Sequence, residues 1–556
     1  MRTETKKCTK CLTDFFLDQD EISFYEKMQV PNPKVCPSCR FKMRALWRNE
    51  TTLYSGRRCD LCDKSIISMY NPKSPYKIYC HECFYSDKWD PKDYAMDYDP
   101  SHSFLEQMKE FLIKVPKITT YLSSGYGPNQ NSEYTNMAGG CKNCYLVFNT
   151  GPAEETLYTR GAKDIKDCSD MYFATKTERC YESVNVQESS GILWGKNVFG
   201  SVDSAFVQNC RGVMNCFGCV NLNNKSYHFL NEPYTQEEYW NKVKEIQGSF
   251  SKTKSFKKEF KDLCLKYPVK ENNDPKSIDS SGDYLFNCKN VKDSFEVARG
   301  EDCRYLFSSK EIKDSYGTIG YGTSCERLLE VVAVGHSSNI IGSYGLEHGN
   351  NMLYCFYTTN CQDCVGCDAL KNTKYAIFNK EYSKEEYEKL KNLIIQELKS
   401  KNLYGLMMPP DLAPFAYNET IGQDNMPMTK EEVLAQGFRW EDDLQKTEGK
   451  ETVQSEQIPD HIKDVTDGIL AEVLACIDCK RNYKITAQEF LFYRKMILPI
   501  PRKCFYCRHK ERINIRGPYK FWKRQCDKCK KEINTNYSPE NKEIVYCESC
   551  YQQEVY

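Results

Sequence analysis

Cysteines spaced as metal ligands occur near both ends of the chain. The sequence has 556 residues and 31 cysteines, and sixteen of the cysteines form eight C-x-x-C pairs at the two ends, four within 8–83 and four within 476–550. Thiolate pairs at this spacing are typical of tetrahedral metal sites, whereas thioredoxin-like redox motifs usually occur singly beside a βαβ pattern. The spacing therefore predicts about four structural zinc ions. The predicted ligands are Cys8, Cys11, Cys36, Cys39, Cys59, Cys62, Cys80 and Cys83 in the N-terminal group, and Cys476, Cys479, Cys504, Cys507, Cys526, Cys529, Cys547 and Cys550 in the C-terminal group.

The two groups are copies of one module. "CDLCDKSIISMYNPKSPYKIYCHEC" from residue 59 and "CDKCKKEINTNYSPENKEIVYCESC" from residue 526 share the spacing of their cysteines and the "YC" before the last pair. Eight thiolates suffice for two four-cysteine sites with no open coordination position, which indicates structural rather than catalytic metals. We expect double zinc-ribbon or treble-clef-like modules. Sequential ligation, first pair with second and third with fourth, is the preferred interpretation, and a cross-braced arrangement is the alternative.

Basic and aromatic residues join the two expected metal sites within each module. Guanidinium groups bind phosphate oxygens in pairs, and aromatic faces stack on unpaired bases. Because 77 basic residues balance 77 acidic ones over the whole chain, this local excess of positive charge indicates contact with RNA or a ribonucleoprotein. The alternative is a solvated linker whose aliphatic stems cover a small zinc fold. The predicted contacts are Arg40, Lys42, Arg44, Trp47, Arg48, Arg508, Lys510, Arg512, Arg516, Trp522, Lys523 and Arg524.

A second duplication lies between the modules. Residues 216–239 align without gaps to residues 364–387, and short apolar runs upstream of each recur at a spacing near 21 residues. This pattern predicts a duplicated right-handed parallel β-solenoid, and hence a mainly β multidomain protein with short helices. Thr235 with Glu238, and Ser383 with Glu386, have the spacing of a helix capping box.

Fifteen cysteines lie outside the zinc modules, and we expect most of them to be small core residues stacked in ladders. The alternative for Cys361, Cys364 and Cys367 is ligation of an iron–sulfur cluster. At a period of 21 residues Asp293 and Asp314 would stack one coil apart, which opens a carbohydrate-active enzyme as a third alternative. Asp-Ser at a coil corner is also ordinary turn chemistry. Walker, dinucleotide-binding and H-E-x-x-H motifs are absent from the sequence, so we expect a protein that is not an enzyme.

The composition sets the expected compartment and domain order. Without an apolar run of about 18 residues or a secretory signal, the sequence predicts a cytoplasmic protein that does not associate with membranes. The expected segments are a zinc module at 1–90, a connector at 91–130, solenoid repeat A at 131–250, a connector at 251–279, solenoid repeat B at 280–400, a Pro-rich and acidic linker at 401–475, and a zinc module at 476–556.

The segments "FAYNET", "FYRKMILPIPR", "RHKERINIRGPYKFWKRQCDKC" and "YSPENKEIVYCESCYQQEVY" resemble an uncharacterised family of long cysteine-rich zinc-ribbon proteins, predicted in candidate-phylum bacteria with reduced genomes. The resemblance implies a bacterial cytoplasmic protein and supplies no activity. It also implies that the site of Cys476, Cys479, Cys504 and Cys507 is the most dispensable of the four.

These patterns together predict a non-catalytic zinc protein that contacts RNA or a ribonucleoprotein through its terminal modules. The alternative function is a protein-interaction scaffold, in which LIM-like modules bind protein partners and the solenoid acts as a spacer.

Overall fold

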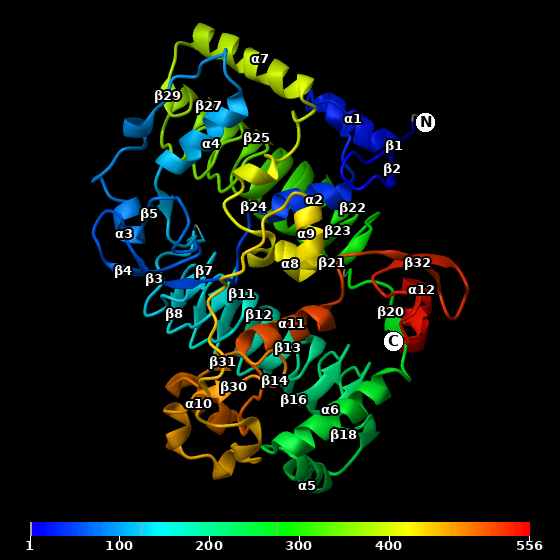
Figure 1. Cartoon of the computed structure of the whole chain (residues 1–556). Coiled ribbons are helices and arrows are strands. Elements are labelled where there is room, and N and C mark those ends of the chain that lie inside the picture. The colour runs from blue at the N-terminus through cyan, green and yellow to red at the C-terminus, as the bar shows by residue number, and fades with distance from the viewer. Residues whose placement is uncertain (1–2, 124, 275, 556) are drawn as a thin grey trace. The chain divides into compact units, whose positions relative to one another are not determined.

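Two compact units make up the chain, and each unit is built from two segments that are distant in sequence. The computed structural model describes residues 3–123, 125–274 and 276–555. Unit 1 comprises residues 1–120 and 272–442, and unit 2 comprises residues 121–271 and 443–556. Both units are mostly β with short helices (Figure 1). The N-terminal cysteine module therefore folds with the second half of the central repeat, and the C-terminal module with the first half.

Each unit contains a parallel ladder whose register is twelve residues. Ladder A (β7–β18, residues 135–229) pairs Met171 with Ser183, and ladder B (β21–β28, residues 282–377) pairs Met352 with Cys364. The predicted period of 21 residues is therefore wrong. Because Glu301 pairs with Lys313 and Cys303 with Ser315, Asp302 lies level with Asp314. The carboxylate stack expected from Asp293 and Asp314 is not formed.

Every third residue of a ladder points toward the buried hydrophobic cluster that the ladder encloses, here called its interior. In ladder A this cluster includes Cys210, Val213, Cys216 and Cys219. The residue before each of these has left-handed backbone, with φ of 53° at Asn209, 62° at Gly212, 51° at Asn215 and 70° at Gly218. Asn and Gly tolerate this conformation better than other residues, so they recur at these corners. A corner every three residues and a register of twelve give four corners per repeat.

Ladder B contains one extra residue that shifts this three-residue phase. Two interior residues, Ile312 and Cys325, are thirteen positions apart, which is one more than a multiple of three. Left-handed backbone runs without interruption from Tyr321 to Ser324, at φ of 63°, 119°, 68° and 52°. A Cβ on Gly322 would lie 1.9 Å from the carbonyl oxygen of Lys310, so glycine is required there.

Many interior thiols and hydroxyls contact backbone groups, although the buried hydroxyls of Thr318 and Thr358 have no hydrogen-bond partner. Cys355 Sγ lies 3.4 Å from the carbonyl oxygens of both Leu353 and Cys364. Ser183 Oγ donates to the Tyr181 carbonyl at 2.8 Å and accepts the Gly195 N–H at 2.8 Å. Fourteen of the fifteen mid-chain cysteines are buried, with Cys264 on a helix half-buried. The prediction that most of them are small core residues is confirmed.

The ends of both ladders are covered in the same way. Antiparallel pairs β18–β19 and β28–β29 are each followed by a helix, α5 and α7 respectively. Thr235 and Glu238 form the predicted capping box on α5, and Ser383 accepts the Glu386 N–H on α7. Within the part of the chain that the structure describes, no helix has the length and apolar character needed to cross a membrane.

The remaining bounds are given by unit. Unit 1 contains α1 (Gln19–Lys27), α2 (Pro37–Ala45), α3 (His81–Phe84), α4 (Phe104–Lys114), α7 (Lys384–Ser400), α8 (Ile421–Asn425), α9 (Lys430–Ala435), β1 (Glu4–Lys7), β2 (Asp14–Leu17), β3 (Tyr54–Arg58), β4 (Ser65–Ser68), β5 (Ile78–Tyr79), β6 (Lys117–Ile118), β21 (Gly282–Phe286), β22 (Lys289–Lys292), β23 (Ser294–Arg304), β24 (Phe307–Val334), β25 (Ser338–Ile341), β26 (Asn350–Leu353), β27 (Gln362–Val365), β28 (Lys374–Ile377) and β29 (Lys380–Glu381).

Unit 2 contains α5 (Gln236–Ile246), α6 (Phe250–Cys264), α10 (Ala487–Met496), α11 (Phe505–Arg516), α12 (Glu548–Val555), β7 (Thr135–Asn136), β8 (Cys141–Lys142), β9 (Val147–Phe148), β10 (Ala153–Glu154), β11 (Arg160–Lys166), β12 (Ser169–Glu178), β13 (Tyr181–Gln187), β14 (Ser190–Leu193), β15 (Lys196–Phe199), β16 (Val202–Gln208), β17 (Met214–Val220), β18 (Ser226–Phe229), β19 (Glu232–Pro233), β20 (Val269–Lys270), β30 (Leu474–Ala475), β31 (Asn482–Tyr483), β32 (Trp522–Gln525), β33 (Glu532–Thr535) and β34 (Val545–Tyr546).

Candidate metal centres and the basic segments they position

The sixteen cysteines of the C-x-x-C pairs form four groups of four. Within each group all Sγ atoms lie within 4.8 Å of one another. In both modules the first pair meets the second and the third meets the fourth, so the preferred sequential ligation is confirmed over the cross-braced alternative. The groups are Cys8, Cys11, Cys36, Cys39; Cys59, Cys62, Cys80, Cys83; Cys476, Cys479, Cys504, Cys507; and Cys526, Cys529, Cys547, Cys550.

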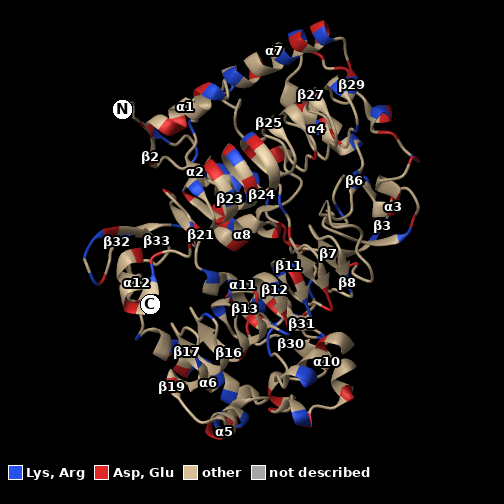
Figure 2. Ribbon diagram, turned by 180° about the vertical axis from the view of Figure 1, so that it is seen from behind, with Lys and Arg blue, Asp and Glu red and all other residues tan. Residues whose placement is uncertain are grey.

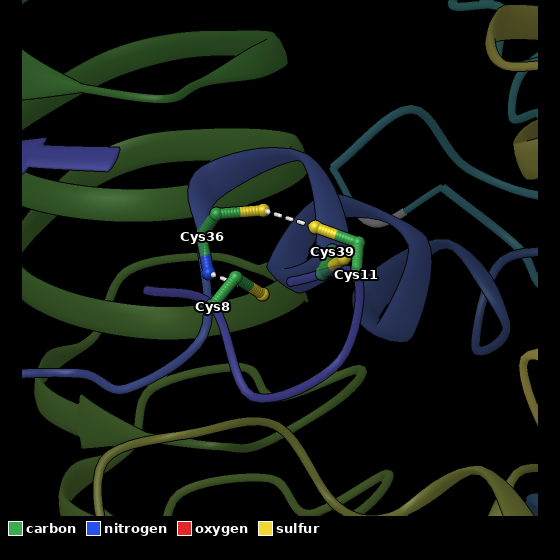
Figure 3. Close-up of side chains that lie close together, drawn as sticks. All are labelled: Cys8, Cys11, Cys36 and Cys39. Atoms are coloured by element: carbon green, nitrogen blue, oxygen red, sulfur yellow. Dashed lines mark hydrogen bonds between the residues drawn. The ribbon is translucent and has the colours of Figure 1, made fainter. Parts of the chain in front are cut away.

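The sulfur spacing fits a tetrahedral metal ion. Four Zn–S bonds of about 2.3 Å require Sγ–Sγ edges of about 3.8 Å. Cys11 and Cys36 Sγ are 3.6 Å apart, as Figure 3 shows for the first group. The matching edges are 3.8, 3.6 and 3.7 Å in the second, third and fourth groups. The donor set and its size therefore suit a four-coordinate ion with sulfur ligands.

Local backbone geometry prepares these thiols for metal binding. The second pair of each group sits at a helix start, as Cys36 does for α2 and Cys504 for α11. The Cys547 N–H donates to Cys526 Sγ at 3.3 Å. Burial raises the pKa of the Cys526 thiol, but backbone N–H groups of Cys529 and Cys547 outweigh burial and lower its pKa to about 6. The same balance lowers the pKa of Cys59 to about 7 and that of Cys476 to about 7. One thiol in each of these three groups is thus held toward the thiolate, the form that binds metal, whereas burial and the neighbouring thiols raise the pKa of Cys550 to about 12.

Helix α2, which follows the first group, carries arginines into the interior of unit 1. Arg40 and Arg44 are both 1% exposed, and both reach the carboxylate of Glu330 on ladder B. The Arg40 distance is 3.0 Å, and Arg40 also donates to the hydroxyl of Tyr25 at 2.8 Å. Arg48 donates to Glu50 at 2.6 Å. Figure 1 shows α2 beside β24.

Helix α11 repeats this arrangement in unit 2. Arg508 and Arg512 meet Asp170 of ladder A at 3.3 Å and 2.5 Å, and Arg508 donates to the hydroxyl of Tyr493 at 2.9 Å. Asp170 and Glu330 both occupy left-handed corners of their ladders, at φ of 58° and 54°. Arg516 continues the same helix face and lies 3.3 Å from the Tyr172 hydroxyl. The duplicated modules therefore attach to their ladders through equivalent buried ion pairs.

This geometry corrects the interpretation of seven predicted nucleic-acid contacts. The seven are buried, and a phosphate cannot reach a guanidinium that is already paired inside a unit. Trp47, 2% exposed, stacks on Phe356 at 4.7 Å between ring centroids. The seven residues are Arg40, Arg44, Trp47, Arg48, Arg508, Arg512 and Arg516.

The other five predicted contacts retain access to solvent. Lys510 and Lys523 are exposed, whereas Lys42, Trp522 and Arg524 are half-buried. Lys42 donates to the Gln436 side chain at 2.9 Å, and Arg524 to the carbonyl of Ser538 at 3.1 Å.

Sequence reasoning missed two sets of residues. Lys528, Lys530 and Lys531 are exposed on or beside the β32–β33 hairpin, whose basic segments Figure 2 shows in blue, and they join the exposed Lys520 of the basic segment before Cys526. The signal that could have found them is the basic run continuing past Cys526. The acidic partners Asp170 and Glu330 gave no local signal, because each lies hundreds of residues from its arginines.

A second small group of potential metal ligands lies on ladder B. His336, Glu347 and His348 each offer one ligand atom within 4.8 Å of the others. Cys361, Cys364 and Cys367, the candidate iron–sulfur ligands, instead point into the ladder. Their Sγ atoms lie 3.4, 3.3 and 3.6 Å from the carbonyl oxygens of Thr359, Gln362 and Val365.

Comparison with known proteins adds little to this geometry. No family model matches the chain, and no curated protein matches it. Among solved structures, a putative acetyltransferase from Desulfovibrio desulfuricans G20 is similar at 10% identity and a TM-score of 0.11, over 59% of this chain and 92% of that chain. A TM-score this low carries no argument about fold or activity.

Proposed function

We propose that this protein is a non-catalytic zinc-binding protein that contacts single-stranded RNA through the β32–β33 hairpin of its C-terminal module. The observation that carries the proposal is the exposure of Lys520, Lys523, Lys530 and Lys531 on or beside the hairpin that carries the half-buried Trp522. Lys523 also lies 3.3 Å from Glu532, in a pair that is exposed on both sides. Lys520 Nζ lies 5.0 Å from the centroid of the Trp522 ring. Ammonium groups attract phosphates, and an indole face stacks on an unpaired base.

Zinc is the metal we assign to the four cysteine groups. Four thiolates at tetrahedral spacing complete its preferred coordination and leave no position for a substrate. The ions would hold the knuckles and the helix starts in place, which is a structural role. Removing the metal from the last group would therefore loosen the β32–β33 hairpin that the proposal needs.

The N-terminal hairpin is less suited to this role because its equivalent residues are engaged within unit 1. Tyr54 is buried and donates to Glu419 at 2.6 Å. Arg57 donates to the Asn71 carbonyl at 3.0 Å, as Arg524 does to the Ser538 carbonyl, and Arg58 stays exposed beside Asp63 at 2.6 Å, so the difference between the hairpins is the burial of Tyr54. The duplicated modules have thus diverged in what their hairpins leave accessible.

We infer that each ladder is a right-handed parallel β-solenoid with coils of twelve residues. The uniform register, the corner at every third residue and the apolar interior cluster of each ladder support this assignment. Such a body would act as a rigid support for the module attached to it.

We also place the protein in the cytoplasm. All 31 cysteines are free thiols, and the sixteen of the C-x-x-C pairs must stay reduced to bind metal. A reducing compartment keeps thiols in that state.

Filter binding of purified protein to mixed-sequence RNA across a salt series tests the proposal. Replacing Lys520, Lys523 and Lys531 by alanine should weaken binding roughly tenfold and reduce the salt slope by about two, because about 0.7 counterions are released per phosphate contact on a single strand. Replacing Lys252, Lys254 and Lys258 by alanine removes the same charge from exposed positions of α6 and should change neither.

Zinc content measured on both variants separates lost contacts from lost structure. Equal binding by the two triple variants, or wild-type binding that does not depend on salt, would refute the RNA proposal and favour the protein-interaction alternative.

A further inference from the structure

Two histidines and one glutamate gather on the outside of ladder B and form a group separate from the four cysteine groups. His336 Nδ1 lies 2.5 Å from Glu347 Oε1, and His348 Nε2 lies 3.8 Å from the same oxygen. The two imidazole rings are stacked, with their centroids 4.8 Å apart and their planes 19° from parallel. Two imidazoles thus share one carboxylate oxygen.

The twelve-residue register creates this arrangement. Gly335 pairs with Glu347 on the next coil, so His336 lies level with His348. Both histidines occupy left-handed corners, with φ of 45° and 53°. A Cβ on Gly335 would lie 1.9 Å from the Tyr321 ring and 2.8 Å from Glu347 Oε2, so glycine leaves room for both side chains.

On the next two coils, the corner equivalent to that of His336 and His348 is occupied by asparagine. One coil after His348 stands Asn360, and Asn372 follows one coil later, at φ of 54° and 49°. Their side chains hydrogen-bond to each other at 2.7 Å. Asparagine therefore satisfies the backbone requirement of this column, and two successive histidines are not needed for the turn.

The donor set and its accessibility suit a transition-metal ion. Imidazole nitrogen with carboxylate oxygen is a ligand set of Zn²⁺ and related divalent ions. The side chains of His336, His348 and Glu347 are 36%, 58% and 16% exposed. All three ligand atoms come from one rigid ladder, so few degrees of freedom are lost when they converge on an ion.

We propose that His336, Glu347 and His348 form a solvent-accessible site for a divalent transition cation, represented by Zn²⁺. The site has three protein ligands, in contrast to the four-thiolate groups, and water completes the coordination. The proposal is independent of the RNA proposal, because the site lies in unit 1 and the β32–β33 hairpin belongs to unit 2.

Equilibrium dialysis of the full chain against buffered Zn²⁺, followed by metal analysis, tests the site. We expect five zinc ions per chain at saturating free metal, and four for the double variant H336N/H348N, which extends the asparagine column and keeps the backbone conformation. Glu347→Gln preserves shape and removes the charge, so affinity for the fifth ion should fall at least about tenfold, or about 1.4 kcal/mol.

The matched control is H102N, which removes a histidine paired with Asp99 at 2.8 Å but lacking a second imidazole. It should retain five ions. Exchange of the fifth ion for Co²⁺ should give absorption bands without the charge-transfer bands of cobalt–thiolate sites. Equal stoichiometry in wild type and H336N/H348N would show that the trio is only an ion pair and overturn the proposal.

Discussion

Arg40 and Arg44 show how single residues attach a small metal module to a large β body. Both guanidinium groups share the carboxylate of Glu330, and all three side chains are almost fully buried. Burial alone lowers the pKa of the Arg40 guanidinium, but Tyr25 and Glu330 outweigh burial and raise it, so Arg40 stays charged. Planar guanidinium groups suit such buried pairs better than ammonium groups.

Glu330→Gln removes the negative charge that Arg40 and Arg44 share, and it leaves the two buried guanidinium groups without a counter-charge. We expect the free energy of unfolding of unit 1 to fall by about 3 to 5 kcal/mol, because an uncompensated buried charge is costly. Denaturant unfolding followed by tryptophan fluorescence measures the change, since Trp47 lies on the segment that follows α2.

The exposed pair of Arg299 with Glu311, 2.6 Å apart, provides the control. Glu311→Gln should cost less than about 1 kcal/mol, as solvent-exposed pairs do. Equal losses for the two variants would mean that the buried pair contributes no more than a surface pair.

The roles of residues that depend on local spacing could be predicted from the sequence, whereas roles that depend on a distant partner could not. The metal ligands were found because each C-x-x-C pair has its own signature within a few positions. The role of Arg44 was missed because its partner, Glu330, lies 286 residues away. A row of arginines spaced by four residues looks the same whether it faces a phosphate or a buried carboxylate.

At the scale of elements, helices with caps were predicted more accurately than the ladder period. Thr235 and Ser383 marked helix starts because capping is local. The matching segments that begin at Val291 and Ile312 are 21 residues apart, a multiple of three but not of twelve. Both segments therefore begin with an inward-pointing residue, but the two residues lie at different corners of the twelve-residue repeat. Cys303 and Cys325 are 22 apart because the extra residue falls between them.

The left-handed corners make a separate prediction for the ladders. At Asn209, with φ of 53°, valine should destabilise unit 2 by about 1 to 2 kcal/mol more than glycine does, because a branched Cβ clashes with the following carbonyl in this conformation. Both variants lose the asparagine side chain, so their difference isolates the backbone effect.

Thermal or denaturant unfolding of the pair N209V and N209G gives the comparison. If the two variants unfold at the same point, strain at the corners is not what selects Asn and Gly there.

At the scale of the whole molecule, the segment predictions named the parts but not their partners. The four cysteine groups and the two parallel ladders lie within the segments predicted for the zinc modules and the solenoid repeats. The predicted segmentation treated each part separately and named no packing partner for it. The structure instead joins residues 1–120 with 272–442, and residues 121–271 with 443–556.

A nicked chain tests this pairing. Gly449 is exposed, and a Cβ there would meet no atom within 4 Å, so a protease site inserted after it should be tolerated. After cleavage, the fragment that begins at residue 450 should remain bound through contacts such as Arg512 with Asp170. Size-exclusion chromatography should show both fragments co-eluting in buffer and separating in denaturant.

Separation of the fragments in buffer would contradict the pairing in unit 2. A nick after Pro539, in the loop between the last two cysteine pairs, provides the comparison. There the bound metal should hold the two fragments together, and they should separate when a chelator removes it.

The pairing of each module with a remote ladder has a consequence for synthesis on the ribosome. Arg40 emerges 290 residues before Glu330. At about 5 to 20 residues per second, the N-terminal module waits roughly 15 to 60 s with its arginine face uncovered. Ladder A emerges during that interval, while its own module has not yet been made. The nascent chain therefore exposes the arginine face of the N-terminal module and the surface of ladder A at the same time. Early metal binding by the N-terminal module would limit incorrect pairing between them.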